Sequence, residues 1–328
     1  MSVPRSALRT AQTVPKVISR KLGNISVHGL LAVDLSFDIS PVRAPWRAVL
    51  PTNVDLFEAM PYTWETALQM LLPPAAKSLL ENQQRKFSRD WTIASRAFPE
   101  LDKKSFLHKW LIVNTRTFYW TVPGAKKLPI PDDCMALNPF ADYFNHADEG
   151  CKVEYGPMGF KIFADRVYEK DEEIYISYGS HSNDFLLVEY GFILSENKWD
   201  ELQLDHIILS ELSTKQRDQL EGVGFLGKYV LDQNTVCHRT QVALRLFCLP
   251  LKKWYRFVNG EDDTEFDQHK ADQVLLKLLT KYEYQAKDVS DQVSSLKIGN
   301  IYQRQMLDKR WKQIRALLKT AINRIQKC

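Results

Sequence analysis

Two segments, residues 138–148 and 172–192, constrain most strongly the fold that this chain can adopt. A β-hairpin pattern lies between them. The first reads NPFADYFNHAD and places polar groups among aromatic ones, whereas the second reads EEIYISYGSHSNDFLLVEYGF. Alternation up to Tyr178 predicts a strand, Gly179 ends it, and the apolar run that follows predicts a helix. Between the two segments, alternating residues flank the turn Gly156-Pro157-Met158-Gly159, which predicts two antiparallel strands. We therefore expect a small central sheet.

The remainder of the chain has mainly helical patterns. Residues 54–120 carry leucines at helical spacing, and residues 121–136 read as a loop because Pro and Gly recur there. The apolar run Leu30–Val33 fits a strand or a helix. Beyond about residue 205 we find no strand pattern. There, a long final helix is predicted by apolar residues at near-heptad spacing, namely Leu307, Trp311, Ile314, Leu318, Ile322 and Ile325. The sequence predicts an α+β front domain and a helical rear domain.

Composition excludes several classes of protein. The chain has 328 residues, enough for two domains, with 45% hydrophobic and 26% charged residues and a net charge of +4. Such a charge does not argue for nucleic-acid binding by the whole molecule. The five cysteines are scattered and odd in number, so they predict neither a disulfide framework nor a zinc site, and they fit the cytoplasm or the nucleus. No run approaches the ~18 apolar residues that a membrane span needs.

The N-terminal region has a charge bias that permits two interpretations. Its first 33 residues contain five basic residues and no acidic one, as in a mitochondrial transit peptide. However, Pro4 and Pro15 interrupt any long amphipathic helix there, since proline lacks an N–H and clashes with the preceding turn. We favour folded protein in this region.

The order of several residues resembles that of a known family. Asp142 lies three residues before Asn145 and His146, the hairpin follows, and then come Tyr178 and the triplet Tyr190-Gly191-Phe192. This order resembles the C-terminal half of the SET methyltransferase domain, in the group of the ribulose bisphosphate carboxylase large-subunit lysine methyltransferase. The resemblance implies a SET-type β-fold at residues 1–204 with a helical insertion at about 52–115. It also implies an all-α C-terminal substrate-binding domain at residues 205–328.

The resemblance implies S-adenosylmethionine as cofactor. This cofactor is a zwitterion with a flat base and a sulfonium, so it needs directional donors and acceptors and a flat wall. The implied cofactor-binding residues are Arg116, Asp142, Asn145, His146, Tyr190 and Phe192. Arg116 lies in a segment like the family's Ser/Thr-Arg-x-Phe, which Ser95–Phe98 also fits. We prefer Arg116 because it follows an amphipathic helix and lies about thirty residues before Asn145.

The resemblance implies that Tyr178 is the catalytic residue. A lysine, whose ordinary pKa is about 10.4, must lose a proton before it attacks a methyl group. A narrow apolar channel favours the neutral amine, and the phenol can then orient it. Thr115 and Phe118 would line this substrate channel. Without the flanking motifs, Tyr178 would read as an ordinary tyrosine on a half-buried strand.

The chain departs from the family pattern in two places. Family members carry a Gly-x-Gly strand and turn upstream of the segment that Val3–Leu8 resembles, and this sequence has none there. We therefore expect a SET domain that lacks its first N-terminal strands. The cysteine cluster that follows the SET domain in histone-type enzymes is also missing, which favours a folded, non-histone protein as substrate.

Several functional interpretations remain open. The leading one is a protein-lysine methyltransferase acting on a protein, with ribosomal or translation-related proteins as candidates. A histidine target is an alternative, because imidazole with an ordinary pKa of about 6.5 loses its proton more easily. Another alternative is a non-catalytic scaffold. A nucleic-acid-binding protein is the least favoured, since it rests only on the eight basic residues of 301–328, which a solvated helix face also explains.

Overall fold

The computed structural model describes residues 1–121, 130–261 and 264–327. Its chain divides into two compact units. Unit 1 comprises residues 1–63, 79–181 and 187–191, and unit 2 comprises residues 64–78, 182–186 and 192–328. Two helices, α6 (Pro74–Ala97) and α8 (Asn183–Tyr190), contribute residues to both units. The boundary after residue 204 stays a prediction.

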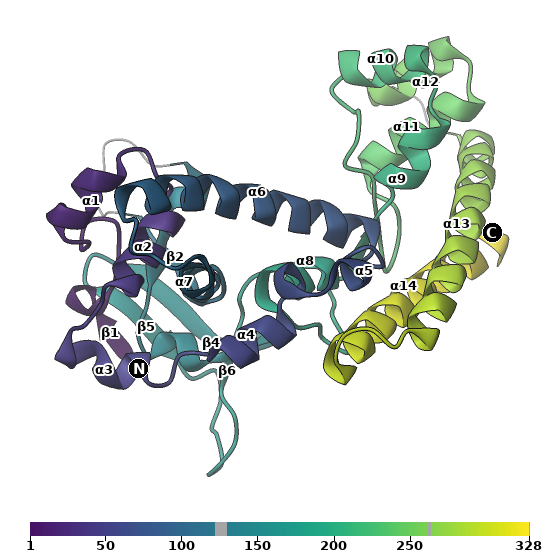
Figure 1. Cartoon of the computed structure of the whole chain (residues 1–328). Coiled ribbons are helices and arrows are strands. Elements are labelled where there is room, and N and C mark those ends of the chain that lie inside the picture. The colour runs from purple at the N-terminus through teal and green to yellow at the C-terminus, as the bar shows by residue number, and fades with distance from the viewer. Residues whose placement is uncertain (122–129, 262–263, 328) are drawn as a thin grey trace. The chain divides into compact units, whose positions relative to one another are not determined.

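Unit 1 contains a four-stranded sheet in the order β1-β5-β4-β6 (Figure 1). Its strands are β1 (Ser2–Pro4), β4 (Asn145–Gly156), β5 (Gly159–Phe163) and β6 (Tyr175–Ile176). The predicted hairpin is confirmed, because β4 and β5 pair antiparallel with Tyr155 opposite Phe160. The strand predicted over residues 172–178 shrinks to two residues. It pairs parallel with β4 at Asn145 and His146 and, after a register shift in β4, again at Cys151.

A second sheet in unit 1 pairs β2 (Thr117–Tyr119) with β3 (Met135–Leu137). The prediction of a loop over residues 121–136 was wrong at β3, where Ala136 and Leu137 are fully buried. Three residues are too few to show a two-residue period, and the surrounding prolines obscured them. Residues 122–129 of that predicted loop lie outside the described part of the chain.

Helices form an apolar core in unit 1. They are α1 (Lys16–Leu22), α2 (Val27–Ser36), α3 (Ala44–Arg47), α4 (Asn53–Ala59), α7 (Lys103–Arg116) and part of α6. The Leu30–Val33 run is helical, because the Ser26 side chain caps α2 by accepting a hydrogen bond from Gly29 N–H at 3.0 Å. Its apolar residues pack against α7, whose Trp110 is fully buried.

Unit 2 is mostly helical, as predicted. Its elements are α5 (Thr66–Gln69), β7 (Glu201–Gln203), α9 (Asp205–Ile208), α10 (Thr214–Gly222), β8 (Val230–Asp232), α11 (His238–Cys248), α12 (Leu251–Val258), α13 (Glu265–Ser295) and α14 (Ile301–Lys327). The long helices α13 and α14 pack against each other along the chain end (Figure 1). The expectation of an all-α region after residue 205 was wrong at β8, which pairs antiparallel with β7. None of the described helices could cross a lipid bilayer.

The basic helix α14 packs with one face buried in unit 2, and one of its cations forms ion pairs there. Leu307, Trp311, Ile314 and Leu318 are buried, which confirms the near-heptad prediction. Arg310 is also fully buried, and its guanidinium donates to Asp184 at 2.8 Å and to Asp200 at 2.6 Å. Both carboxylates are nearly inaccessible, so this ion triad holds α14 against the start of α8 and the segment before β7.

Replacing Arg310 by Met should destabilise the protein by about 3–5 kcal/mol, because two buried carboxylates would lose their cation. The measurement is the free energy of unfolding in urea. Lys312→Met is the matched control on the same helix, since Lys312 pairs with Asp308 at the surface and its loss should cost less than about 1 kcal/mol. Equal losses for the two variants would contradict the role given to the triad.

Candidate functional site

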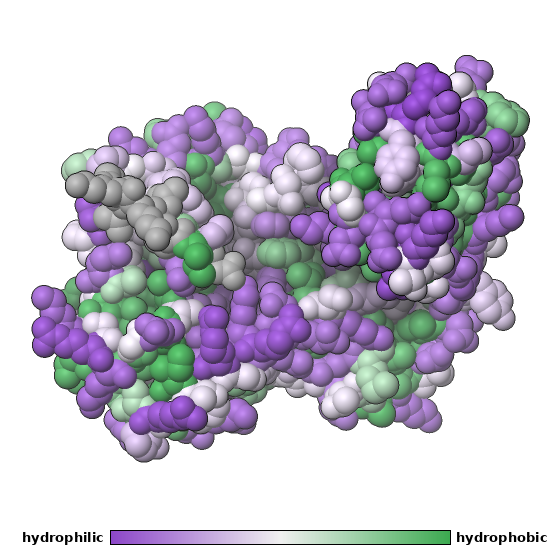
Figure 2. Space-filling model, turned by 90° about the horizontal axis from the view of Figure 1, so that it is seen from above, coloured by the Kyte–Doolittle hydropathy of each residue, from purple (hydrophilic) through white to green (hydrophobic). Residues whose placement is uncertain are grey.

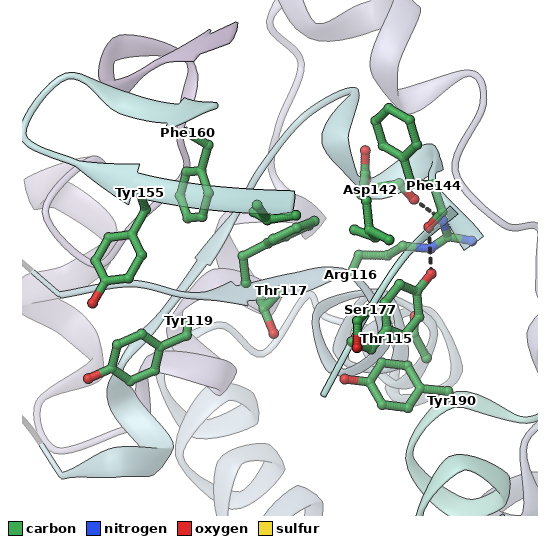
Figure 3. Close-up of a pocket in the computed structure, with 14 residues that line it drawn as sticks. Thr115, Arg116, Thr117, Tyr119, Asp142, Phe144, Tyr155, Phe160, Ser177 and Tyr190 are labelled. Atoms are coloured by element: carbon green, nitrogen blue, oxygen red, sulfur yellow. Dashed lines mark hydrogen bonds between the residues drawn. The ribbon is translucent and has the colours of Figure 1, made fainter. Parts of the chain in front are cut away.

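A cavity of about 280 Å³ lies in unit 1, where the end of α7 and strand β2 meet β4, β5 and β6. Figure 3 shows the two ends of this cavity. Arg116, Asp142, Phe144, Ser177 and Tyr190 gather at one end, and Tyr119, Tyr155 and Phe160 gather at the other. The remaining lining residues are Thr115, Thr117, Phe118, Val153, Ile176 and Tyr178. The cavity therefore joins a polar end to an aromatic end.

Tyr178 is held at three points of this cavity. Its hydroxyl donates a hydrogen bond to the Phe144 carbonyl at 2.6 Å, and its backbone N–H donates to His146 Nδ1 at 3.1 Å. Its ring lies 5.1 Å from the Tyr190 ring, centroid to centroid. Burial raises the pKa of Tyr178 above its ordinary value. The phenol is therefore neutral at physiological pH, and its oxygen can still accept a hydrogen bond.

His146 positions Tyr178 from outside the cavity lining. The imidazole is buried, with 6% of the residue exposed, and it stacks on the Tyr178 ring at 5.1 Å. Its Nδ1 accepts the Tyr178 N–H, so that nitrogen must be unprotonated. Burial lowers the pKa of His146, which favours the neutral ring. The sequence predicted a cofactor-binding role for this residue, and the described contacts are those of a support for Tyr178.

Arg116 and Asp142 form the charged part of the site. The Arg116 guanidinium donates to the backbone carbonyl of Asp142, and the Asp142 Oδ2 accepts from Trp46 Nε1 at 2.9 Å. The other oxygen, Oδ1, is buried and accepts no hydrogen bond from the described residues. Burial raises the pKa of Asp142, and the Trp46 hydrogen bond and Arg116 oppose that rise. A guanidinium beside a buried carboxylate oxygen suits a ligand that carries both an anionic and a cationic group.

The other predicted residues divide into two groups. Thr115, Phe118 and Tyr190 line the cavity with Arg116, whereas Arg96 of the competing Ser95–Phe98 segment is exposed on α6. Asn145 and Phe192 do not line the cavity. Asn145 is exposed and its Nδ2 donates to Glu173 Oε1 at 2.6 Å. Phe192 is half-buried, and its N–H donates to the Leu186 carbonyl.

The sequence analysis missed several lining residues. Phe144 contributes a backbone carbonyl, a group that every residue has, so no sequence signal could single it out. Ser177 and Tyr155 lie on or beside strands that the alternation predicted, which places them in the sheet without saying which face lines a cavity. Tyr119 and Phe160 depend on how β2 faces β5, which local patterns do not encode.

Comparison with known proteins gives consistent matches. The SET domain model matches residues 51–179, and the model of the Ribosomal lysine N-methyltransferase 2 C-terminal domain matches residues 200–324. Ribosomal lysine N-methyltransferase set11 of Schizosaccharomyces pombe is 28% identical, covering 82% of this chain and 71% of that protein. SET domain-containing protein 4 of Mus musculus is 26% identical, covering 94% and 77%. These matches confirm the resemblance predicted from the sequence.

A solved structure confirms the predicted fold. The structure of Rubisco LSMT bound to sinefungin and monomethyllysine matches with a TM-score of 0.63 at 16% identity. The match covers 99% of this chain and 81% of that chain. Ribosomal lysine N-methyltransferase 2 of Saccharomyces cerevisiae is a shorter match, 28% identical over 58% of this chain and 45% of that protein.

The contact between His146 and Tyr178 should make stability depend on pH. Because folding lowers the pKa of His146, its contribution to stability is complete above its ordinary pKa of about 6.5 and is lost as the pH falls below that value. His146→Asn keeps an acceptor that does not titrate, and at pH 7.5 it should cost about 1 kcal/mol.

Urea unfolding of parent and variant between pH 7.5 and 5.5 checks this expectation. Their difference in free energy of unfolding should narrow as the pH falls, since only the parent loses the His146 contribution. Other histidines titrate in both proteins and cancel in the comparison. A constant difference over this range would show that His146 does not act as a neutral acceptor.

Proposed function

Because this chain belongs to the SET-domain protein methyltransferases, we propose that it transfers a methyl group from S-adenosylmethionine to a lysine side chain of a protein. One observation carries the proposal. Tyr178, Arg116 and Asp142 line a single cavity within this fold. Two of the relatives are named as ribosomal lysine methyltransferases, which supports the same activity.

The residues of the polar end suit the cofactor. S-adenosylmethionine, when bound, supplies an electrophilic methyl group on a sulfonium. Its amino-acid end carries a carboxylate and an ammonium, for which Arg116 offers a guanidinium and Asp142 a buried carboxylate oxygen that accepts no hydrogen bond from the described residues. We assign Tyr190 as a wall of the same end, and we keep Asn145, His146 and Phe192 as proposed cofactor residues whose side chains do not line the cavity.

Tyr178 orients the amine of the substrate. Its hydroxyl proton is given to the Phe144 carbonyl, so the phenol oxygen presents its lone pairs to an incoming N–H. The walls formed by Phe118, Val153 and Phe160 are apolar, and they disfavour the charged ammonium relative to the neutral amine. A neutral amine held in one direction needs little further help, because orientation supplies most of the rate.

We propose a ribosomal protein as the substrate, met in the cytoplasm or the nucleus. The support is the names of two relatives and the C-terminal match over residues 200–324, which we assign to substrate docking. A folded, non-histone target follows from the same reasoning. Lysine is favoured over histidine because the phenol oxygen of Tyr178 accepts N–H groups, and a neutral amine offers two or more of these whereas a neutral imidazole offers one.

Tyr178→Phe should lower the rate of methyl transfer by roughly 100-fold while leaving cofactor affinity unchanged, because only the orientation of the amine is lost. The measurement is transfer of tritiated methyl from S-adenosylmethionine to a ribosomal-protein preparation. Cofactor affinity is measured separately by calorimetry. Amino-acid analysis of the labelled product should show methyllysine.

The matched control is Tyr175→Phe, the same chemical change three residues earlier, on β6. Tyr175 does not line the cavity, and its hydroxyl donates to Glu173 Oε2 at 2.6 Å. The control should retain full activity. Methylhistidine in the product would replace the lysine assignment, and cofactor binding without any transfer by the parent would favour a non-catalytic scaffold.

A further inference from the structure

A second cavity in unit 1, of about 570 Å³, is lined largely by polar residues. It lies where the start of α2 meets α6, the end of α7 and strands β2 and β3. Three of its lining residues are cations from α6, namely Arg85, Lys86 and Arg89. Figure 2 views the side of unit 1 on which α6 lies in Figure 1, and hydrophilic residues form much of that surface.

The spacing of these cations directs them to the same side of α6. Residues 85, 86 and 89 occupy adjacent positions on one helical turn, since residues four apart lie one above the other. Arg85 is exposed and forms no ion pair with the described residues. The Arg89 side chain is 63% exposed, and its Nε lies 3.9 Å from Asp90 Oδ1. Two arginines that line the cavity therefore have little compensation for their charge among the described residues.

The two acidic residues among the described ones that line the cavity, Asp90 and Asp133, already accept hydrogen bonds from other residues of unit 1. Asp90 accepts from the Ser26 hydroxyl at 2.7 Å and from Trp110 Nε1 at 3.1 Å, and only 1% of it is exposed. Asp133 accepts from the Val27 N–H at 2.9 Å. Both carboxylates thus hold the beginning of α2, where unpaired N–H groups favour negative charge. The guanidinium groups of Arg85 and Arg89 remain as charged groups available to a ligand.

The second cavity shares a wall with the first. Thr117 lines both cavities, and Asn114 of the second directly precedes Thr115 and Arg116 of the first. A peptide whose target side chain occupies the first cavity therefore has neighbouring residues within reach of the second. The two cavities together can read a target residue and its flanking sequence.

We propose that the cavity beside Arg85, Lys86 and Arg89 is a substrate subsite that takes an acidic side chain flanking the target residue. The assignment rests on the proposed function, because that function places a peptide in the first cavity. Acidic peptide fits better than nucleic acid, since none of the described residues that line this cavity is Phe, Tyr or Trp. The imidazole ring of His28, which does line the cavity, stacks on Trp110 with ring centroids 3.9 Å apart, and this limits base stacking.

The test uses two fluorescein-labelled peptides that share one central lysine. One carries aspartates on both sides of it, and the other carries asparagines at the same positions. Fluorescence polarisation at low salt should show that the protein binds the aspartate peptide roughly tenfold more tightly, as expected for two exposed ion pairs. Arg85→Glu with Arg89→Glu should abolish this preference. Arg85→Gln with Arg89→Gln should reduce it without adding an acid near Asp90.

The matched control is Arg20→Glu with Arg96→Glu, which makes the same change in net charge at exposed residues of unit 1 outside the cavity. This control should keep the full preference. No binding of the aspartate peptide by the parent, or an equal loss in the control, would overturn the subsite. Tighter binding of a single-stranded RNA oligonucleotide, lost in the Arg85 and Arg89 variant, would overturn the choice of an acidic peptide.

The same proteins separate this inference from the proposed function. If the parent prefers the aspartate peptide but transfers no methyl group to any substrate, the subsite stands and the enzymatic proposal fails. If the parent and the Arg85 and Arg89 variant methylate both peptides equally well, the enzymatic proposal stands and the subsite is overturned. Both readings use the full chain and S-adenosylmethionine.

Discussion

The site depends on one short contact, the parallel pairing of β6 with the beginning of β4. This pairing sets Asn145 beside Tyr175 and His146 beside Ile176, so two segments about thirty residues apart meet. Tyr178 then lies where its N–H reaches His146 and its hydroxyl reaches the Phe144 carbonyl. Parallel pairing needs a crossover between the strands, and here the β5 hairpin strand and the segment after it provide that connection.

Polar groups that the fold buries have structural partners, and this decides which charges remain for ligands. In unit 1, Asp90 and Asp133 hold the start of α2, so Arg85 and Arg89 of α6 have little compensation for their charge among the described residues. In unit 2 it is a cation that is buried and paired, because Arg310 forms ion pairs with Asp184 and Asp200. A basic helix in the sequence therefore differs from a basic surface in the structure. Arg310 is therefore not accessible to a nucleic acid, which weakens the least favoured interpretation, nucleic-acid binding through residues 301–328.

The quality of each prediction followed the length of the pattern behind it. The hairpin of β4 and β5 and the long helix α14 have many repeats, so their periods are clear and the structure agrees. Strands β3 and β8 have three residues each, which is less than two periods, and both were missed. The site followed the same rule. Arg116, Asp142 and Tyr178 lie in segments with several informative neighbours, and the structure brings them into one cavity.

By itself, the sequence determined the class of the fold, its main helices, the central hairpin and a short set of residues that meet in the cavity. These properties depend on local periods and on motifs, which are visible in the sequence without knowledge of the tertiary structure. Three relations were decided only by the tertiary structure. His146 supports Tyr178, Asn145 donates a hydrogen bond to Glu173, and Thr117 lines both cavities. Such relations arise from strand register and from the direction in which each side chain points. Both are set by the packing of distant segments rather than by neighbouring residues.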